Sequence, residues 1–234
     1  MEQRTLDRPP SLTDAVVAHI RDGIIRADYA PGQPLTEAAL SEELGTSRGT
    51  VREALRELSG LGLVDRSTHR GAVVSELTAR DAEEVYTLRA SLESFAAQLA
   101  AEHGHLDKAA LGKLRRRLAA IERVADAGDV PAMVSADMDF HTALSGLSGH
   151  ELLIEHLAAI QVHSRRVLFY SDLYRPTPEV VVQRHRDLYA VLCTGDPYRI
   201  SLAVDQHITG PNMDIVEKIR ARERDEEETA SEDT

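Results

Sequence analysis

Apolar positions in the first third of the chain predict helices joined by a tight turn. Residues 35–74 have the pattern of a helix, a turn, a second amphipathic helix and a β-hairpin. The second helix repeats apolar residues at the i, i+3, i+4, i+7 spacing of one buried face. These residues are Val51, Ala54, Leu55 and Leu58. Leu40 and Leu44 give the preceding helix an apolar face of its own.

The turn and the hairpin carry signals of their own. Gly45 stands where a left-handed residue is needed between the two helices, and Ser47 is a predicted N-cap of the second. Two short apolar runs at 61–64 and 72–74 enclose a polar tip. Residues 11–76 are therefore predicted to form a winged helix-turn-helix domain of three helices and a β-hairpin wing.

After the wing the apolar spacing is helical, and no alternating strand pattern returns. One long helix is predicted from Asp81 to about Glu102. Further helices are predicted at about 106–127, 130–147, 150–172, 178–194 and 197–220, with Gly and Pro residues between them. The fold class is thus mostly α, and residues 80–220 are expected to form an all-α antiparallel bundle.

The two ends of the chain are predicted to lie outside these domains. Residues 1–10 are expected to be a flexible N-terminus. Beyond Arg224 the segment DEEETASEDT has six acidic residues and no basic one. Such a charge run favours disorder, so residues 221–234 are expected to be a disordered acidic tail.

The composition of the chain indicates the cellular compartment in which the protein is expected. The chain of 234 residues is long enough for two modest domains, and its single cysteine, Cys193, allows no internal disulfide. No apolar run approaches the roughly 20 residues of a membrane span, and the N-terminus does not resemble a signal peptide. A cytoplasmic protein without a membrane partner is expected.

The net charge of −12 has to be reconciled with a DNA partner. Even residues 1–76 hold 9 basic against 12 acidic side chains. Binding, however, depends on the field at the contact face, and Arg48, Arg52 and Arg56 follow one side of the second helix. A guanidinium group can read guanine in the major groove. Double-stranded DNA is the predicted partner; the alternative is an ordinary solvated face.

A second group of residues has the spacing of a metal site. Asp137 and His141 are four residues apart on one helix, so they project from the same face. The turn at residue 196 is the midpoint between His185 and His207, so two antiparallel helices would place these histidines side by side. One carboxylate and three imidazoles are a ligand set for Zn²⁺, Ni²⁺ or Mn²⁺. The alternative is that these histidines lie at the surface or in the core without a metal.

Longer segments resemble a known family. The stretch TSRGTVREALRELSGLGLV, followed by RGAVV, resembles the DNA-binding signature of the GntR superfamily of bacterial transcription regulators. That resemblance implies sequence-specific operator binding by a homodimer. It places Ser47, Arg48, Thr50 and Arg52 at the DNA, with Arg70 and Gly71 in the wing. Gly49 departs from the family pattern, which commonly has Thr there, so operator preference cannot be copied from relatives.

The second half resembles the FCD ligand-binding domain of the FadR subfamily in YTLRASLESFAAQLAA, DMDFHTALSGLSGH and QRHRDLYAVLCTGD with DQHI. The resemblance implies that Asp137, His141, His185 and His207 hold a divalent metal, with Zn²⁺ expected on isolation and Ni²⁺ or Mn²⁺ as alternatives. It also implies a small carboxylate effector that completes the metal shell and modulates operator affinity. Arg89, in the R-x-x-L-E segment, is a candidate second anchor for that carboxylate. The alternative for Arg89 is an ion pair with Glu93 one turn away.

Two other classes of function stay open at this point. An Asp and three His around a metal with an open position could activate water, as in a metal-dependent hydrolase. The chain has no HExxH motif and no evident general base, so an enzyme is not expected. The other alternative is a DNA-binding protein whose metal is purely structural.

Overall fold

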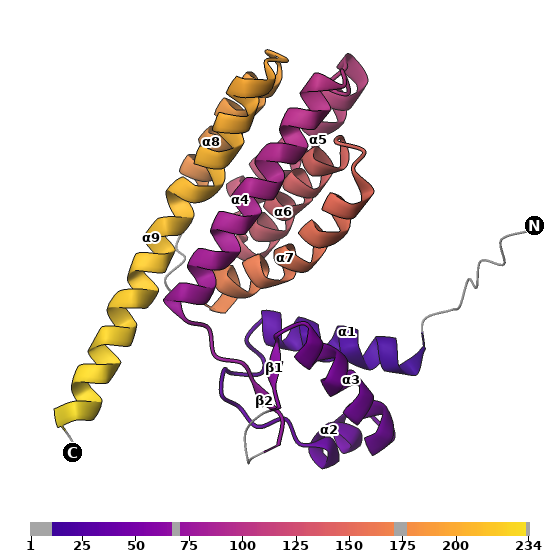
Figure 1. Cartoon of the computed structure of the whole chain (residues 1–234), viewed down its shortest axis with the longest axis vertical. Helices are drawn as coiled ribbons and strands as arrows, with labels where there is room; N and C mark the ends of the chain where they lie inside the picture. Colours follow the sequence, from indigo (N-terminus) through magenta and orange to yellow (C-terminus); the bar gives the residue numbers. More distant parts are fainter. Residues whose placement is uncertain (1–10, 67–70, 171–176, 233–234) are drawn as a thin grey trace, which may run out of the picture. The chain divides into compact units, whose positions relative to one another are not determined.

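The computed structural model describes residues 11–66, 71–170 and 177–232. The chain divides into two compact units, Met1–Leu77 and Thr78–Thr234. The described part is mostly helical, with one small antiparallel sheet in the first unit (Figure 1). The predicted fold class, a winged helix-turn-helix followed by an all-α domain, is confirmed. The predicted flexible N-terminus, residues 1–10, lies outside the described residues.

The first unit contains three helices and two short strands. They are α1 (Leu12–Ile25), α2 (Glu37–Glu43), α3 (Arg48–Gly60), β1 (Val64–Asp65) and β2 (Val73–Val74). Helix α1 begins with a capping box, in which the Ser11 side chain accepts from the backbone N–H of Asp14 and the Asp14 carboxylate accepts from that of Ser11. Between α2 and α3, Gly45 has a φ of +60°, which glycine adopts at little cost.

The apolar face predicted for α3 forms the centre of this unit. Val51, Ala54, Leu55 and Leu58 are all buried, and α3 packs against α1 and α2. Burying these side chains on one face leaves the opposite face of α3 to solvent, where the arginines lie.

A third segment of the chain, which the sequence pattern does not predict, pairs with the wing. Val64 pairs with Val74 and Asp65 with Val73 in the β1–β2 ladder. On the other side of β2, Pro34 forms an isolated bridge with Val73, and the backbone N–H of Leu35 donates to Ala72 O. The segment before α2 therefore ties the base of the wing to the helices.

The second unit is a bundle of long helices. They are α4 (Ala79–Glu102), α5 (Lys108–Asp126), α6 (Val130–Gly146), α7 (Glu151–Tyr170), α8 (Pro178–Leu192) and α9 (Pro197–Glu232). Helix α4 packs along α9 and against α6 and α7, while α5 packs against α6 and α8 (Figure 1). The hydrophobic core of this bundle contains Leu114, Leu118, Ile121, Phe140, Leu144, Leu192, Ile200 and Val204.

Helix α9 corrects the prediction for the acidic tail. The tail was expected to be disordered from residue 221, but α9 continues to Glu232. Arg222 pairs with Glu226 one turn later, which supports an exposed helix. The Glu223 carboxylate also accepts a 2.8 Å hydrogen bond from the backbone N–H of Ala79 at the start of α4. Local ion pairs and this contact explain why charge alone was misleading.

None of the helices within residues 11–66, 71–170 and 177–232 combines the length and apolar character that crossing a membrane requires.

Candidate metal centre and DNA-recognition helix

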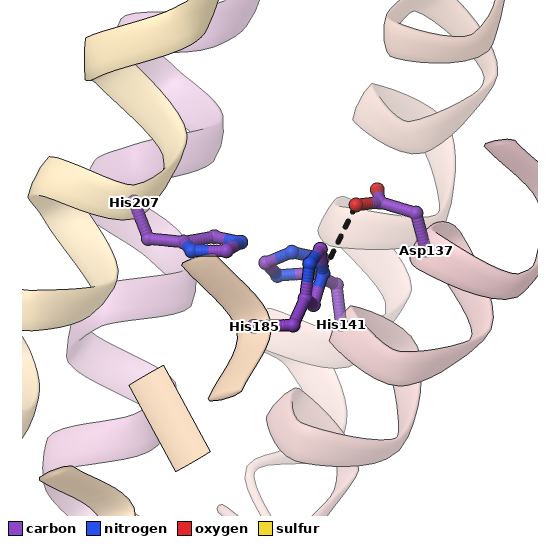
Figure 2. A group of neighbouring side chains, drawn as sticks. All are labelled: Asp137, His141, His185 and His207. Carbon is purple, nitrogen blue, oxygen red and sulfur yellow. Dashed lines mark ion pairs between the residues drawn. The ribbon is translucent and has the colours of Figure 1, made fainter. Parts of the chain in front are cut away.

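Three helices of the second unit bring the four predicted ligands together. Asp137 and His141 lie on α6, His185 on α8 and His207 on α9 (Figure 2). One donor atom from each residue lies within 4.8 Å of the others. The rings of His185 and His207 are 4.5 Å apart between centroids, as expected from their symmetric placement about the turn at residue 196. The side chains therefore converge, while metal binding stays a prediction.

The hydrogen bonds around the cluster leave lone pairs directed into it. Nδ1 of His141 donates to Glu93 Oε2 at 2.7 Å, and Nδ1 of His185 donates to the carbonyl of Val181 at 2.9 Å. In neutral rings this leaves each Nε2 as an acceptor. Nε2 of His185 is buried, lies 3.1 Å from Asp137 Oδ1 and has no hydrogen-bond partner among the described residues. Because both atoms carry lone pairs, a cation between them would remove their repulsion.

The size and charge of the cluster also fit a divalent cation. Opposite ligands on an ion with 2.1 Å bonds lie about 4.2 Å apart, so a separation of 4.8 Å needs only a small inward movement. Burial would raise the pKa of Asp137, but its contact with the His185 ring, followed by its proximity to His141 and Arg89, holds that pKa well below its usual range. Burial lowers the pKa of His207 well below its usual value, and the neighbouring imidazole groups of His185 and His141 act in the same direction. A charged carboxylate and a neutral imidazole are the forms that bind metals.

Glu93 connects the cluster to Arg89 inside the bundle. Its carboxylate is fully buried and accepts from Arg89 Nε at 2.6 Å through one oxygen and from His141 through the other. Burial would raise the pKa of Glu93, but the charge of Arg89, followed by the neighbouring imidazole of His141, lowers it to about 2. Glu93 thus fixes the tautomer and orientation of His141, a role that outer-shell carboxylates have in many metal sites.

Sequence reasoning missed this role of Glu93 and considered it only as a partner for Arg89. That ion pair, the alternative stated for Arg89, is present. It does not use the whole guanidinium group: Nη2 of Arg89 is buried and has no hydrogen-bond partner among the residues described. A buried donor without an acceptor can serve an anionic ligand, so Arg89 stays a predicted effector anchor.

Helix α3, the candidate recognition helix, begins where the sequence predicts. Ser47 is its N-cap, with its Oγ accepting from the backbone N–H of Thr50 at 3.1 Å and lying 2.9 Å from Thr50 Oγ1. Arg48 is exposed, as is Gly49, which offers no side chain to a groove. The face is therefore accessible, whereas contacts of these residues with DNA stay predictions.

Arg52 is held by a residue that sequence reasoning missed. Its Nε and Nη2 donate to the two carboxylate oxygens of Glu37, at 2.7 and 2.6 Å, in a parallel fork. Glu37 lies in the first turn of α2, and the hydrogen bond with Arg52 lowers its pKa. Because a guanidinium group has five N–H donors, the rest of Arg52 remains available for another acceptor. Glu37 therefore orients the arginine.

The wing residues are only partly described. Gly71 is exposed and has a φ of +89°, a conformation that favours glycine at this position whether or not it contacts DNA. Arg70 lies outside the described residues.

Taken together, the winged helix-turn-helix with an exposed arginine helix and the helical unit with its buried Asp/His cluster define a class: two-domain DNA-binding regulators. Residues 12–74 match the family described as bacterial regulatory proteins, gntR family, and residues 84–210 match the FCD domain. The chain belongs to the GntR family of bacterial transcriptional regulators, with an FCD domain as its second unit.

Individual relatives agree with this assignment. The "Probable D-xylose utilization operon transcriptional repressor" of Paenarthrobacter nicotinovorans is 29% identical over 199 residues, covering 82% of this chain and 85% of that protein. An HTH-type regulator in an unstable DNA locus of Streptomyces ambofaciens is 30% identical, covering 86% and 84%. E. coli McbR/YncC has the same fold, with a TM-score of 0.74 at 24% identity over 89% of this chain and 98% of that one. The family consists of transcriptional regulators and not of enzymes, so the chain is a DNA-binding transcriptional regulator.

Proposed function

We propose that the chain acts as a homodimer whose operator affinity is modulated by a small organic acid bound at a divalent metal in the FCD domain. The observation that carries this proposal is the convergence of Asp137, His141, His185 and His207, whose donor atoms lie within 4.8 Å of one another. The buried Nε2 of His185, which lies 3.1 Å from Asp137 Oδ1 and has no hydrogen-bond partner among the described residues, supports a cation rather than a hydrogen-bonded core.

The four side chains would hold the metal and leave room for a ligand. A divalent ion that accepts five or six ligands would keep one or two positions for an oxygen donor, and as a Lewis acid it would attract a carboxylate. Zn²⁺ is the ion expected on isolation, with Ni²⁺ and Mn²⁺ as alternatives.

Arg89 supports an acid as the ligand. Its buried Nη2 has no acceptor among the residues described, and its positive charge is close enough to Asp137 to lower the pKa of that carboxyl. A guanidinium group prefers carboxylates to neutral oxygens because its hydrogen bonds to them are charge-assisted. A small carboxylate or hydroxy acid fits both the metal and this arginine.

On the DNA side, Ser47, Arg48, Thr50 and Arg52 of the recognition helix would meet the major groove, and Arg70 and Gly71 of the wing would approach the backbone or minor groove. Two copies would read the halves of a palindromic operator. An acid can change operator affinity only if it binds the DNA-bound and free states unequally, and the same coupling then acts in both directions.

A thermal-unfolding screen against small carboxylates, with bound metal and after chelation, tests the proposal. An acid at a hundred times its Kd should add about 2.7 kcal/mol to the free energy of unfolding, and only when the metal is present. His207→Ala should remove this stabilisation, whereas His156→Ala, which alters an exposed histidine on α7, should retain it.

Three outcomes would contradict the proposal in different ways. Chelation without any effect on stability would argue against the metal. Stabilisation that persists after chelation and in His207→Ala would place the acid elsewhere. Collapse on chelation with no response to any acid would make the metal structural.

Glu37 provides a separate test of the recognition helix. Glu37→Gln should reduce the preference for operator over scrambled DNA by several-fold, because the fork that orients Arg52 is lost. Binding to scrambled DNA should not weaken, since the variant removes a negative charge near the phosphates. Fluorescence anisotropy with both duplexes at one salt concentration measures this ratio, and an unchanged ratio would remove Glu37 from the positioning role.

A further inference from the structure

Helix α9 contains a proline one turn after a candidate metal ligand. Pro211 lies inside the helix and has no backbone N–H, so it cannot donate to the carbonyl of residue 207. The proline ring also crowds that same carbonyl. The carbonyl belongs to His207, so the helix lacks its usual backbone hydrogen bond at the residue whose ring completes the cluster.

Arg184 supplies a donor to this carbonyl from another helix. Its Nη2 donates to His207 O at 2.8 Å. A Cβ built on Gly210 would lie 3.5 Å from the same Nη2, so the guanidinium group lies directly over the backbone of this turn. Arg184 is on α8, next to His185 in the sequence.

Side chains also bond to carbonyls on either side of His207. Asn212 is buried, and its Nδ2 donates to Ile208 O at 2.6 Å. Thr209 Oγ1 donates to Asp205 O at 2.8 Å. These contacts lie within α9, so they cannot fix its distance from α8. The Arg184 hydrogen bond, by contrast, joins the turn around Pro211 to α8, the helix that carries His185.

The geometry points to Arg184 as a positioning residue, which replaces the donor that Pro211 removes and thereby holds His207 against His185. The two helices are then tied at two levels, by the Arg184–carbonyl bond and by the side chains of the cluster. Where it concerns metal binding, this inference rests on the proposed function. It predicts that the contribution of Arg184 to metal affinity and to stability depends on proline at position 211.

A double-mutant cycle tests this dependence, with Co²⁺ alone as the probe. Arg184→Met keeps the apolar stem and removes the donors, and should weaken Co²⁺ binding about tenfold or more, as loss of outer-shell support does elsewhere. Pro211→Ala restores a backbone N–H for His207 O. In that background Arg184→Met should cost no more than about twofold to threefold, because the carbonyl then has a donor of its own.

Affinity is measured by competition with a chromophoric chelator, and the Co²⁺ absorption spectrum reports the ligand geometry. The matched control is Arg186→Met. Arg186 lies two residues after Arg184 on the same helix, and its exposed guanidinium group bonds to Glu122, so this variant removes the same charge without affecting the His207 carbonyl. It should leave both readouts unchanged. An equal loss in Arg186→Met would show that charge, not the carbonyl bond, matters.

Thermal unfolding of the metal-free variants provides a second reading of the same cycle. Arg184→Met should lower the melting temperature more with Pro211 than with alanine there. If this coupling is present but the unaltered protein binds no Co²⁺, the inference about Arg184 holds and the proposed metal site is wrong. If Arg184→Met has the same effect in both backgrounds in either readout, the inference is overturned.

Discussion

Arg52→Ala is expected to abolish specific operator binding while the protein remains folded. An arginine that reads guanine contributes about 1–3 kcal/mol of discrimination, and the proposed dimer would lose one such contact in each half-site, about 2–6 kcal/mol in all. The side chain is half exposed, and its hydrogen-bond partner among the described residues is the surface carboxylate of Glu37, so removing it opens no core cavity. The change in affinity can therefore be attributed to the DNA contact.

The measurement is fluorescence anisotropy with an operator selected from random duplexes, together with melting of the free protein. Arg56→Ala is the matched control, because it removes the same charge from the same helix face, from an arginine whose carboxylate partner, Glu53, lies on α3 itself. It should weaken binding to operator and scrambled DNA alike and reduce the salt dependence. Equal specific losses in the two variants would exclude a distinct reading role for Arg52.

The features that the sequence predicts well are those governed by short-range geometry. The buried face of α3 follows from the 3.6-residue period, and its start at Arg48 follows from the capping chemistry of Ser47. The meeting of His185 and His207 follows from their equal distances to one turn. In each case the relevant residues lie on one helix or on two helices joined by a short connection, so spacing alone determines which side chains meet.

The features that sequence reasoning misses depend on packing between distant segments. Glu93 bonds to His141 across 48 positions, and Glu37 bonds to Arg52 across 15. Nothing in the local pattern of α4 distinguishes Glu93 from an ordinary i, i+4 partner of Arg89. The contact of Arg184 also depends on packing between helices, because its acceptor is the His207 carbonyl, to which Pro211 cannot donate. Such contacts require the relative placement of helices, which periodicity does not provide.

Glu93→Ala is expected to have the largest effect on stability, about 3–5 kcal/mol. Removing one member of a buried ion pair leaves an uncompensated charge, and Arg89 is only 2% exposed. The same substitution removes the acceptor that orients His141, so metal affinity should fall by about tenfold to a hundredfold. Chemical denaturation of the metal-free protein measures the first effect, and chelator competition measures the second.

Two further variants separate these effects. Glu122→Ala also removes a carboxylate with two arginine partners, Arg115 and Arg186, but their side chains are half exposed, so its cost should not exceed about 1 kcal/mol. The double variant Arg89→Met with Glu93→Leu replaces the buried pair by apolar side chains and should recover much of the stability. It should not recover the metal affinity, because His141 still lacks its acceptor. Recovery of both properties would mean that Glu93 only neutralises Arg89 and has no influence on the metal centre.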